Sequence, residues 1–332
     1  MSPRMSKADL LERFESAITD AGGRVIRSNN THPFDLSIIS PRDMEPHRVR
    51  LYIWNVTHGG GSARAPGEYR IQLTGVESPL EAPSGFRVLL MGIHDEVFAA
   101  FDPKHHREFS SNSPSIQIPL ETLERAQTLG LAGHRRANGE TAVAIRDDLL
   151  LAYVENQEAI HDMAADQVSL NILEASASKG YVPEDATVEL PTERQRVVRQ
   201  VAGMQRAADF RKRVLRAYEF RCAACGLQLR LPEAAHIVPV PIPGSTDTTS
   251  NGLSLCPLHH TAYDTSLLGI MENYEMRVSA HKIEELLDAG LAEGEEAFRA
   301  APLPKILLPV NSSDRPDPTY LAQGLAARGW AA

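Results

Sequence analysis

All three cysteines of this 332-residue chain lie in one segment, from Cys222 to Asp264, and they constrain the fold more than any other feature. Two residues separate Cys222 from Cys225, and Cys256 and His259 repeat that spacing about thirty residues later. Three thiolates and one imidazole from two such short turns are the ligand set of a closed tetrahedral zinc site. The spacing therefore predicts a structural zinc ion bound by these two cysteines together with Cys256 and His259.

Residues that a zinc site does not need lie between and beside these ligands. His236 ends a short apolar run, Asn251 and Gly252 form a turn dipeptide, and His260 directly follows the proposed ligand His259. The parts C-x-x-C, A-A-H-I-x-P and N-G-L-x-L-C-P-x-H-H, in this order, resemble the HNH (ββα-metal) endonuclease family in its zinc-knuckle form. The resemblance covers roughly residues 210–282. It implies a C-terminal ββα-metal domain that is held together by zinc and hydrolyses phosphodiester bonds in DNA.

The resemblance also implies a role for each of these residues. Hydrolysis of a phosphodiester needs a base that deprotonates water and a cation that neutralises charge developing on the phosphate. His236 would be the general base, and Asn251 would fix the loop or the ring that orients it. His260 would bind a single divalent cation, magnesium or manganese.

The second ligand of this catalytic ion is left open, because the position that carries Asp or Glu in many relatives is Ala235 here. Asp264 lies one helical turn after His260 and is the first candidate, and Asp247 is the second. Three alternatives remain. A zinc ribbon that binds DNA or protein without cutting would use the same four zinc ligands; His259 and His260 could exchange roles; and Asp264 could be a carboxylate of the helix surface.

A cluster of basic residues precedes the first cysteine. Between Arg194 and Arg221 there are nine basic residues and two acidic ones, although the whole chain has a formal net charge of −9. The net charge argues against a protein that coats nucleic acid by charge alone, whereas a local cluster beside a nuclease core is where phosphates would dock. The candidate DNA-binding residues are Arg211, Arg213 and Arg216, and the competing interpretation is a solvated helix face.

The sequence pattern of residues 1–156 predicts an α+β domain that is rich in strands and barrel-like, with a strongly bent sheet. The predicted strands are 48–56, 69–73, 86–91, 97–101 and 115–118. The predicted helices are 6–21, which starts behind the N-cap Ser6, 120–129 and 147–156. The predicted breaks are a glycine-rich stretch at 59–61 and a hairpin turn at 137–139.

A non-catalytic domain in front of a nuclease would select the target. The layout resembles that of modification-dependent restriction endonucleases, which carry a base-reading domain before a C-terminal HNH domain. This implies double-stranded DNA as the substrate and a modified base as the feature that is read. A reader that takes a base out of the stack needs aromatic faces, so Trp54 and Tyr69 are the candidate residues, although aromatic residues in alternating strands are more often part of the core.

The remaining segments complete the predicted organisation. We expect residues 157–200 to form a helical linker that is interrupted at 183–191. Residues 201–282 should form the HNH nuclease domain, and residues 283–332 should form a C-terminal helix with an extended tail. No apolar run is long enough to span a bilayer and the N-terminus is not signal-like, so we expect a cytoplasmic protein with reduced cysteines.

We therefore expect a metal-dependent DNA endonuclease with a restriction or defence role. One ββα unit cuts one strand, so double-strand cleavage predicts a homodimer on DNA. Two alternatives stay open: an HNH effector whose N-terminal domain senses a small signal or a protein, and a zinc-dependent DNA-binding protein that does not cut.

Overall fold

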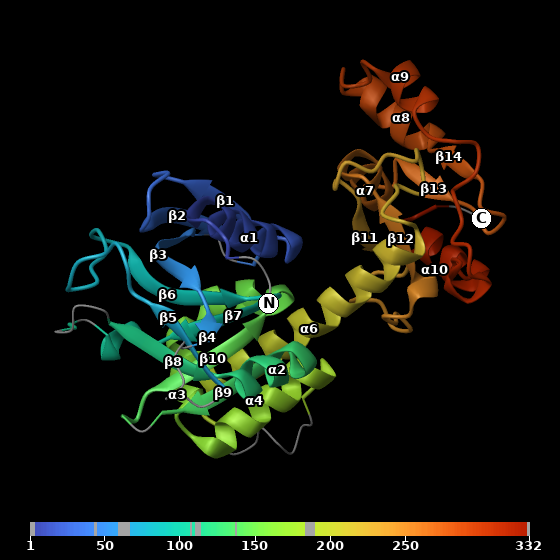
Figure 1. Ribbon diagram of the computed structural model, residues 1–332. Helices are drawn as coiled ribbons and strands as arrows, with labels where there is room; N and C mark the ends of the chain where they lie inside the picture. Colours follow the sequence, from blue (N-terminus) through green and yellow to red (C-terminus); the bar gives the residue numbers. More distant parts are fainter. Residues whose placement is uncertain are drawn as a thin grey trace. The chain divides into compact units, whose positions relative to one another are not determined.

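The computed structural model describes residues 4–42, 45–58, 67–106, 108–109, 114–136, 138–182 and 190–330. The predicted break at 59–61, Ala137 of the predicted hairpin turn and residues 183–189 lie outside these ranges. The chain forms two compact units, Met1–Arg206 and Ala207–Ala332 (Figure 1). Within the ranges given, no helix combines the length and the apolar character that crossing a membrane requires.

A seven-stranded sheet organises the first unit (Figure 1). Its strands, in spatial order, are β1 (Arg24–Arg27), β2 (Phe34–Ile39), β3 (His47–Asn55), β6 (Arg87–His94), β7 (Val97–Phe101), β10 (Thr141–Arg146) and β9 (Leu131–Arg135). Neighbouring strands are antiparallel except β3 and β6, which run parallel with Leu51 opposite Leu89. The mixed, strand-rich fold class is as predicted. In the described strands, however, the sheet is open, with β1 and β9 at its edges, and is not closed into a barrel.

A second, three-stranded sheet packs against one face of the first. Its strands, in order, are β4 (Thr57–His58), β5 (Glu68–Gln72) and β8 (Ser115–Pro119). Gly92 of β6 lies at the contact, because a Cβ atom there would overlap the side chains of Ile71 and Val56. The residue at this point of the large sheet must therefore lack a side chain for the two sheets to approach each other. Helix α2 (Leu120–Leu129) covers the same face and contributes Leu123 to this core.

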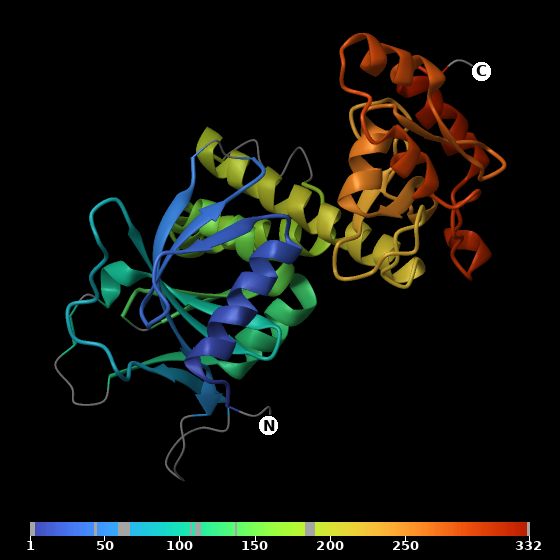
Figure 2. The same ribbon diagram turned by 90° about the horizontal axis from the view of Figure 1, so that it is seen from above.

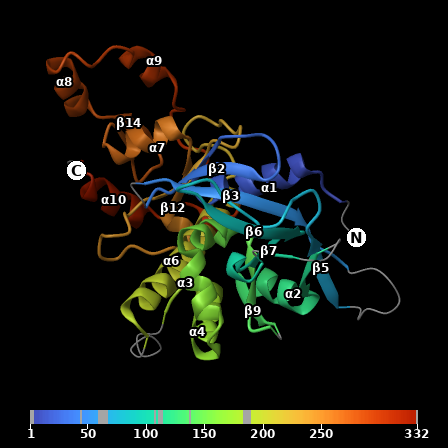
Figure 3. The same cartoon turned by 90° about the vertical axis from the view of Figure 1, so that its left-hand side faces the viewer.

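Three further helices cover the opposite face of the sheet. Helix α1 (Lys7–Asp20) begins at Ser6 with a capping box, as predicted, and lies along the sheet (Figure 2). Helices α3 (Leu150–Ala164) and α4 (Gln167–Lys179) lie side by side (Figure 3). Ile160, Met163 and Leu173 are buried in the core of this unit. The described parts of the segment 157–200, which was predicted to be a linker, therefore contribute buried residues to the first unit's core.

The long helix α6 (Thr192–Ala217) leads from the first unit into the second. The second unit contains the predicted ββα arrangement, formed by β11 (Glu233–His236), β12 (Gly252–Leu255) and α7 (Pro257–Asp264). A small hairpin and three short helices follow: β13 (Leu268–Ile270), β14 (Met276–Val278), α8 (Ala280–Asp288), α9 (Glu295–Ala300) and α10 (Pro318–Ala327). The tail, expected to be extended, thus ends in helix α10, whose Leu321 is fully buried in the core of this unit.

Candidate functional site

The four predicted zinc ligands come together in the second unit. The ligand atoms of Cys222, Cys225, Cys256 and His259 all lie within 4.8 Å of one another, and His259 Nδ1 is 3.2 Å from Cys256 Sγ and 3.7 Å from Cys222 Sγ. In the described part of the chain this is the one group of three or more such ligand atoms so close together. A set of three sulfur atoms and one imidazole nitrogen suits a tetrahedral zinc ion.

Local backbone structure forms the two turns that carry these ligands. In the first turn the Gly226 amide donates to Cys222 O (2.8 Å), and Gly226 has a φ of +77°, which favours glycine. In the second turn Cys256 is the N-cap of α7, Pro257 follows at the first helical position, and His259 lies in the first helical turn. The Ala223 amide donates to Ser254 O (2.6 Å) and so joins the first turn to β12.

Burial sets the protonation of the ligands. Burial raises the pKa of the Cys222 and Cys256 thiols, and it lowers the pKa of His259. His259 is therefore neutral, which is the form that binds metals, whereas the thiols need a cation nearby to lose their protons. A dication in the cluster would supply that charge, so the residues present fit zinc.

His236, at the end of β11, is held on two sides. Its Nε2 atom is 2.8 Å from Asp247 Oδ1, and its ring stacks on Phe210 of α6 with ring centroids 3.8 Å apart and an interplanar angle of 10°. A carboxylate accepts hydrogen bonds, so the imidazole proton lies on Nε2 and Nδ1 carries the lone pair. Asp247, the second candidate for the metal ligand, is thus the partner of the histidine.

Helix α6 reaches this histidine because Gly252 leaves room for it. A Cβ atom on Gly252 would overlap a methyl group of Val214 and lie 3.1 Å from the Phe210 ring. The turn dipeptide Asn251-Gly252 therefore allows the close packing of α6 on the hairpin as well as the turn itself.

Asn251 fixes the loop that begins after His236. Its side chain is fully buried, accepts a hydrogen bond from the Val238 amide (2.9 Å) and donates one to Thr246 O (2.7 Å). Its own carbonyl accepts from the Ile237 amide (2.9 Å). The contacts agree with a residue that fixes the loop carrying Asp247.

His260 lies on α7 between two carboxylates. Its Nδ1 atom is 3.0 Å from Glu233 Oε2 and its Nε2 atom is 3.3 Å from Asp264 Oδ2. The hydrogen bond with Glu233 and the negative charge of Asp264 raise the pKa of His260. A divalent cation at this position would have to displace the ring proton that these carboxylates favour, and the carboxylate oxygens are the ligands that a hard cation prefers.

Glu233 was missed in the sequence because the acidic ligand was sought directly before the base histidine. Ala235 occupies that position and is buried in the core of the unit, 1% exposed, where a carboxylate would be unfavourable. Glu233 supplies a carboxylate three residues before His236, at the start of the same strand. The sequence carries no local signal for this carboxylate, because its contact with His260 arises only when β11 and α7 pack together.

The three arginines predicted to bind DNA have different environments. Arg213 binds Asp209 (2.9 Å), Thr249 Oγ1 (3.0 Å) and the carbonyl of Asp247 (2.7 Å), so it holds the loop beside His236. Arg216 is exposed and Arg211 half-buried, and neither has an ion-pair partner among the described residues. These two arginines keep charge available for a phosphate.

The two aromatic residues proposed as base readers are not equally accessible. Trp54 is 4% exposed, its indole nitrogen donates to Thr74 O (3.1 Å), and Lys7 Nζ lies 4.3 Å above its ring. Tyr69 is half-buried and makes an edge contact with His94. The tryptophan is thus a core residue in this structure, and no face of it is open to a base.

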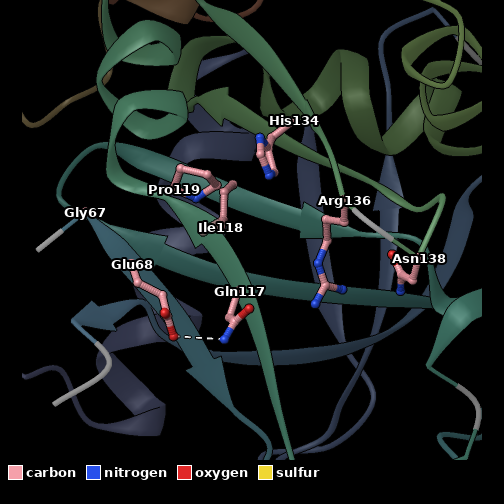
Figure 4. A pocket seen from close by; sticks show the side chains of 8 residues that line it. All are labelled: Gly67, Glu68, Gln117, Ile118, Pro119, His134, Arg136 and Asn138. Carbon is pink, nitrogen blue, oxygen red and sulfur yellow. Dashed lines mark hydrogen bonds between the residues drawn. The ribbon is translucent and has the colours of Figure 1, made fainter. Parts of the chain in front are cut away.

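The first unit contains an open pocket of about 480 Å³ that is lined by both polar and apolar residues (Figure 4). On one side Gln117 Nε2 donates to Glu68 Oε1 (2.8 Å), and on the other Arg136 and Asn138 reach the buried carboxylate of Glu140. The remaining lining residues are Gly67, Ile118, Pro119 and His134. The cavity offers hydrogen-bond donors and acceptors together with an apolar floor, which is the composition of small-molecule and base-binding sites.

Comparisons with known proteins match two separate segments of the chain. The family described as HNH endonuclease matches residues 222–271, and the family described as methylase-associated X1 matches residues 47–154. No curated protein matches the chain. Among solved structures, a modification-dependent TagI restriction endonuclease is similar over 72% of this chain and 78% of its own, with 14% identity and a TM-score of 0.29. A segment of the second unit, residues 222–271, is thus similar to the HNH endonuclease family.

Proposed function

We propose that the protein is a metal-dependent DNA endonuclease of restriction type, whose first unit selects the DNA and whose second unit cuts it. The observation that carries the proposal is the geometry of His236, which is stacked on Phe210 and hydrogen-bonded to Asp247 within the segment that matches HNH endonucleases. A histidine oriented by a carboxylate, with its other nitrogen carrying a lone pair, has the arrangement of a general base.

In this proposal His236 Nδ1 takes a proton from the attacking water, and Asp247 stabilises the imidazolium that forms. Asn251 holds the loop that carries the carboxylate. His260, with Glu233 or Asp264, would hold a divalent cation, which when bound would neutralise charge developing on the phosphate. Arg211 and Arg216 contribute positive charge for the DNA backbone.

Cleavage of plasmid DNA by the His236→Ala variant tests the proposal. The wild type should nick or linearise plasmid in the presence of magnesium or manganese, whereas the variant should bind the same DNA without cutting it. His281→Ala is the matched control, because His281 is an exposed histidine on α8 with its side chain 78% exposed. Full cleavage by His236→Ala would overturn the catalytic assignment.

Selection of the DNA is proposed for the first unit, on two grounds: the matched family is described as methylase-associated, and the unit contains the open pocket with its polar side chains. A base taken out of the stack needs both hydrogen-bond donors and acceptors, and Gln117 and Asn138 present both. Cleavage of matched unmodified, methylated, hydroxymethylated and phosphorothioated DNA should reveal a preference. The Gln117→Ala, Asn138→Ala double variant should lose that preference while still cutting. Equal cleavage of all substrates by the wild type would contradict base reading.

Cutting both strands would need two copies of the second unit, and we propose that a homodimer forms on DNA. Sedimentation of the protein with and without DNA tests this. A monomer in both conditions, together with linear plasmid products, would overturn it.

A further inference from the structure

Arg328, directly after helix α10, lies where the two halves of the nuclease motif meet. Its side chain is 6% exposed. Nη1 donates to Ile237 O (2.6 Å), and Nη2 donates to His236 O (3.2 Å) and to Asp264 Oδ1 (3.1 Å). One guanidinium therefore binds the end of β11, which carries the proposed base, and the end of α7, which carries His260.

The face of this guanidinium is occupied as well. Its central carbon lies 4.0 Å from the centre of the Tyr263 ring, and Tyr263 is itself 1% exposed. Nη1 also donates to Gly324 O (3.3 Å), so the fork of donors reaches four oxygens. Planar stacking and such a fork are properties of arginine that lysine does not share. The site is thus built for this side chain and not merely for a positive charge.

The backbone around Arg328 is fixed independently. A Cβ atom on Gly324 would lie 2.5 Å from Ile237 O, so α10 can pack directly on the strand only with glycine at this position. Ser266 Oγ donates to Arg328 O (2.7 Å), and Leu321 is fully buried. Helix α10 is therefore seated on the motif through several contacts that do not involve the guanidinium.

We propose that Arg328 is a positioning residue of the nuclease. By binding β11 and α7 at once, it fixes the proposed base His236 relative to His260, which would help to hold a divalent cation. The inference rests on the proposed function, because it assumes that these two histidines carry the chemistry. It assigns a role in the reaction to the C-terminal segment, which lies outside the residues matched by the nuclease family.

Arg328→Lys tests this role, because lysine keeps the charge and loses the fork. We expect the single-turnover cleavage rate to fall roughly 10- to 100-fold, since a small displacement of reacting groups is costly. The dissociation constant for DNA should change by less than about twofold, and zinc content should be unchanged. Hydrogen exchange of the Ile237 and Val238 amides, both of which are bonded to Asn251, should become faster.

Arg315→Lys is the matched control, because Arg315 lies in the same segment and donates to the carbonyls of Pro309 and Val310, away from the histidines. It should leave cleavage and amide exchange unchanged. Ser266→Ala is a milder second variant that keeps the guanidinium and removes one bond to the backbone of Arg328. It should slow cleavage by about 2- to 5-fold, and it keeps the test valid if Arg328→Lys does not fold.

Two results would overturn the inference: an Arg328→Lys variant that folds and cuts at the wild-type rate with unchanged exchange, or an equal loss of cleavage in Arg315→Lys. If Arg328→Lys does not fold, unchanged cleavage in Ser266→Ala overturns it. Wild-type protein that binds DNA and zinc but never cuts would instead overturn the proposed function, so the two failures are distinguishable.

Discussion

One side chain, that of Asp247, determines which nitrogen of His236 is free to accept a proton. Asp247 binds Nε2, so removing its charge while keeping its shape changes the preferred tautomer without creating a cavity. The bond from Arg213 to the carbonyl of Asp247 does not depend on the Asp247 side chain, so the substitution leaves it in place.

Asp247→Asn should therefore reduce the cleavage rate by roughly 10²- to 10⁴-fold, since an amide can donate to the histidine and hold the wrong tautomer. Melting temperature and DNA affinity should stay at wild-type values. Asp288→Asn is the control, because Asp288 is an exposed carboxylate at the end of α8. Wild-type rates in Asp247→Asn would show that the carboxylate does not orient the base.

The buried amino group of Lys7 should make the free energy of unfolding of the first unit depend on pH. Burial, with a smaller contribution from Arg4, lowers the pKa of Lys7 from 10.5 to about 7. Between these values the unfolded chain binds a proton that the folded chain does not, so stability should rise with pH across this window. Urea unfolding at about pH 7.5 and about pH 9.5 should show the rise, and Lys7→Met should remove it. Lys104→Met, at an exposed lysine, should keep it.

Candidate site residues can be predicted from the sequence when a fixed spacing along the chain identifies them. The proposed zinc ligands and the proposed site residues His236, Asn251 and His260 follow from short motifs. Glu233 and Arg328 do not, because their contacts arise only when β11, α7 and α10 pack together.

At the level of elements, the junction of α6 and β12 depends on a glycine. Gly252→Ala should destabilise the second unit by about 1–3 kcal/mol, because the added methyl group would overlap Val214 and press on Phe210. It should also slow cleavage, because Phe210 is the ring on which His236 stacks.

Gly203→Ala provides the contrast on the same helix. A Cβ atom there would meet no heavy atom within 4 Å, so alanine should stabilise α6 by about 0.5–1 kcal/mol. Thermal unfolding of both variants checks the pair. Equal effects of the two substitutions would contradict the packing argument.

Local sequence patterns predict individual helices and strands better than they predict which of these elements pack or pair with one another. The capping box at Ser6 and the helical spacing after it predict α1, and the alternation in 48–56 predicts most of β3. The parallel pairing of β3 with β6 could not be predicted, because two strands of another sheet lie between them in the sequence. The helices of 157–200 were predicted as helices, but their burial depends on the sheet they cover.

For the whole molecule, two units with separate cores predict two responses to the loss of zinc. Cys225→Ser removes one ligand of the cluster, and a closed zinc site contributes folding free energy. The melting transition of the second unit should fall and zinc content should drop, while the transition of the first unit stays in place and serves as the internal control. Calorimetry with metal analysis checks both; unchanged zinc and melting would show that Cys225 is not a ligand.

Every thiol of the chain belongs to this one cluster, and that has a consequence for handling the protein. If a zinc ion is removed from the cluster, Cys222 and Cys225 are close enough to be oxidised to a disulfide by dissolved oxygen after a small movement of the turn. A preparation made with a chelator and no reductant would then be locked in an oxidised form that cannot be reloaded. Its lack of activity would reflect the buffer and not the enzyme.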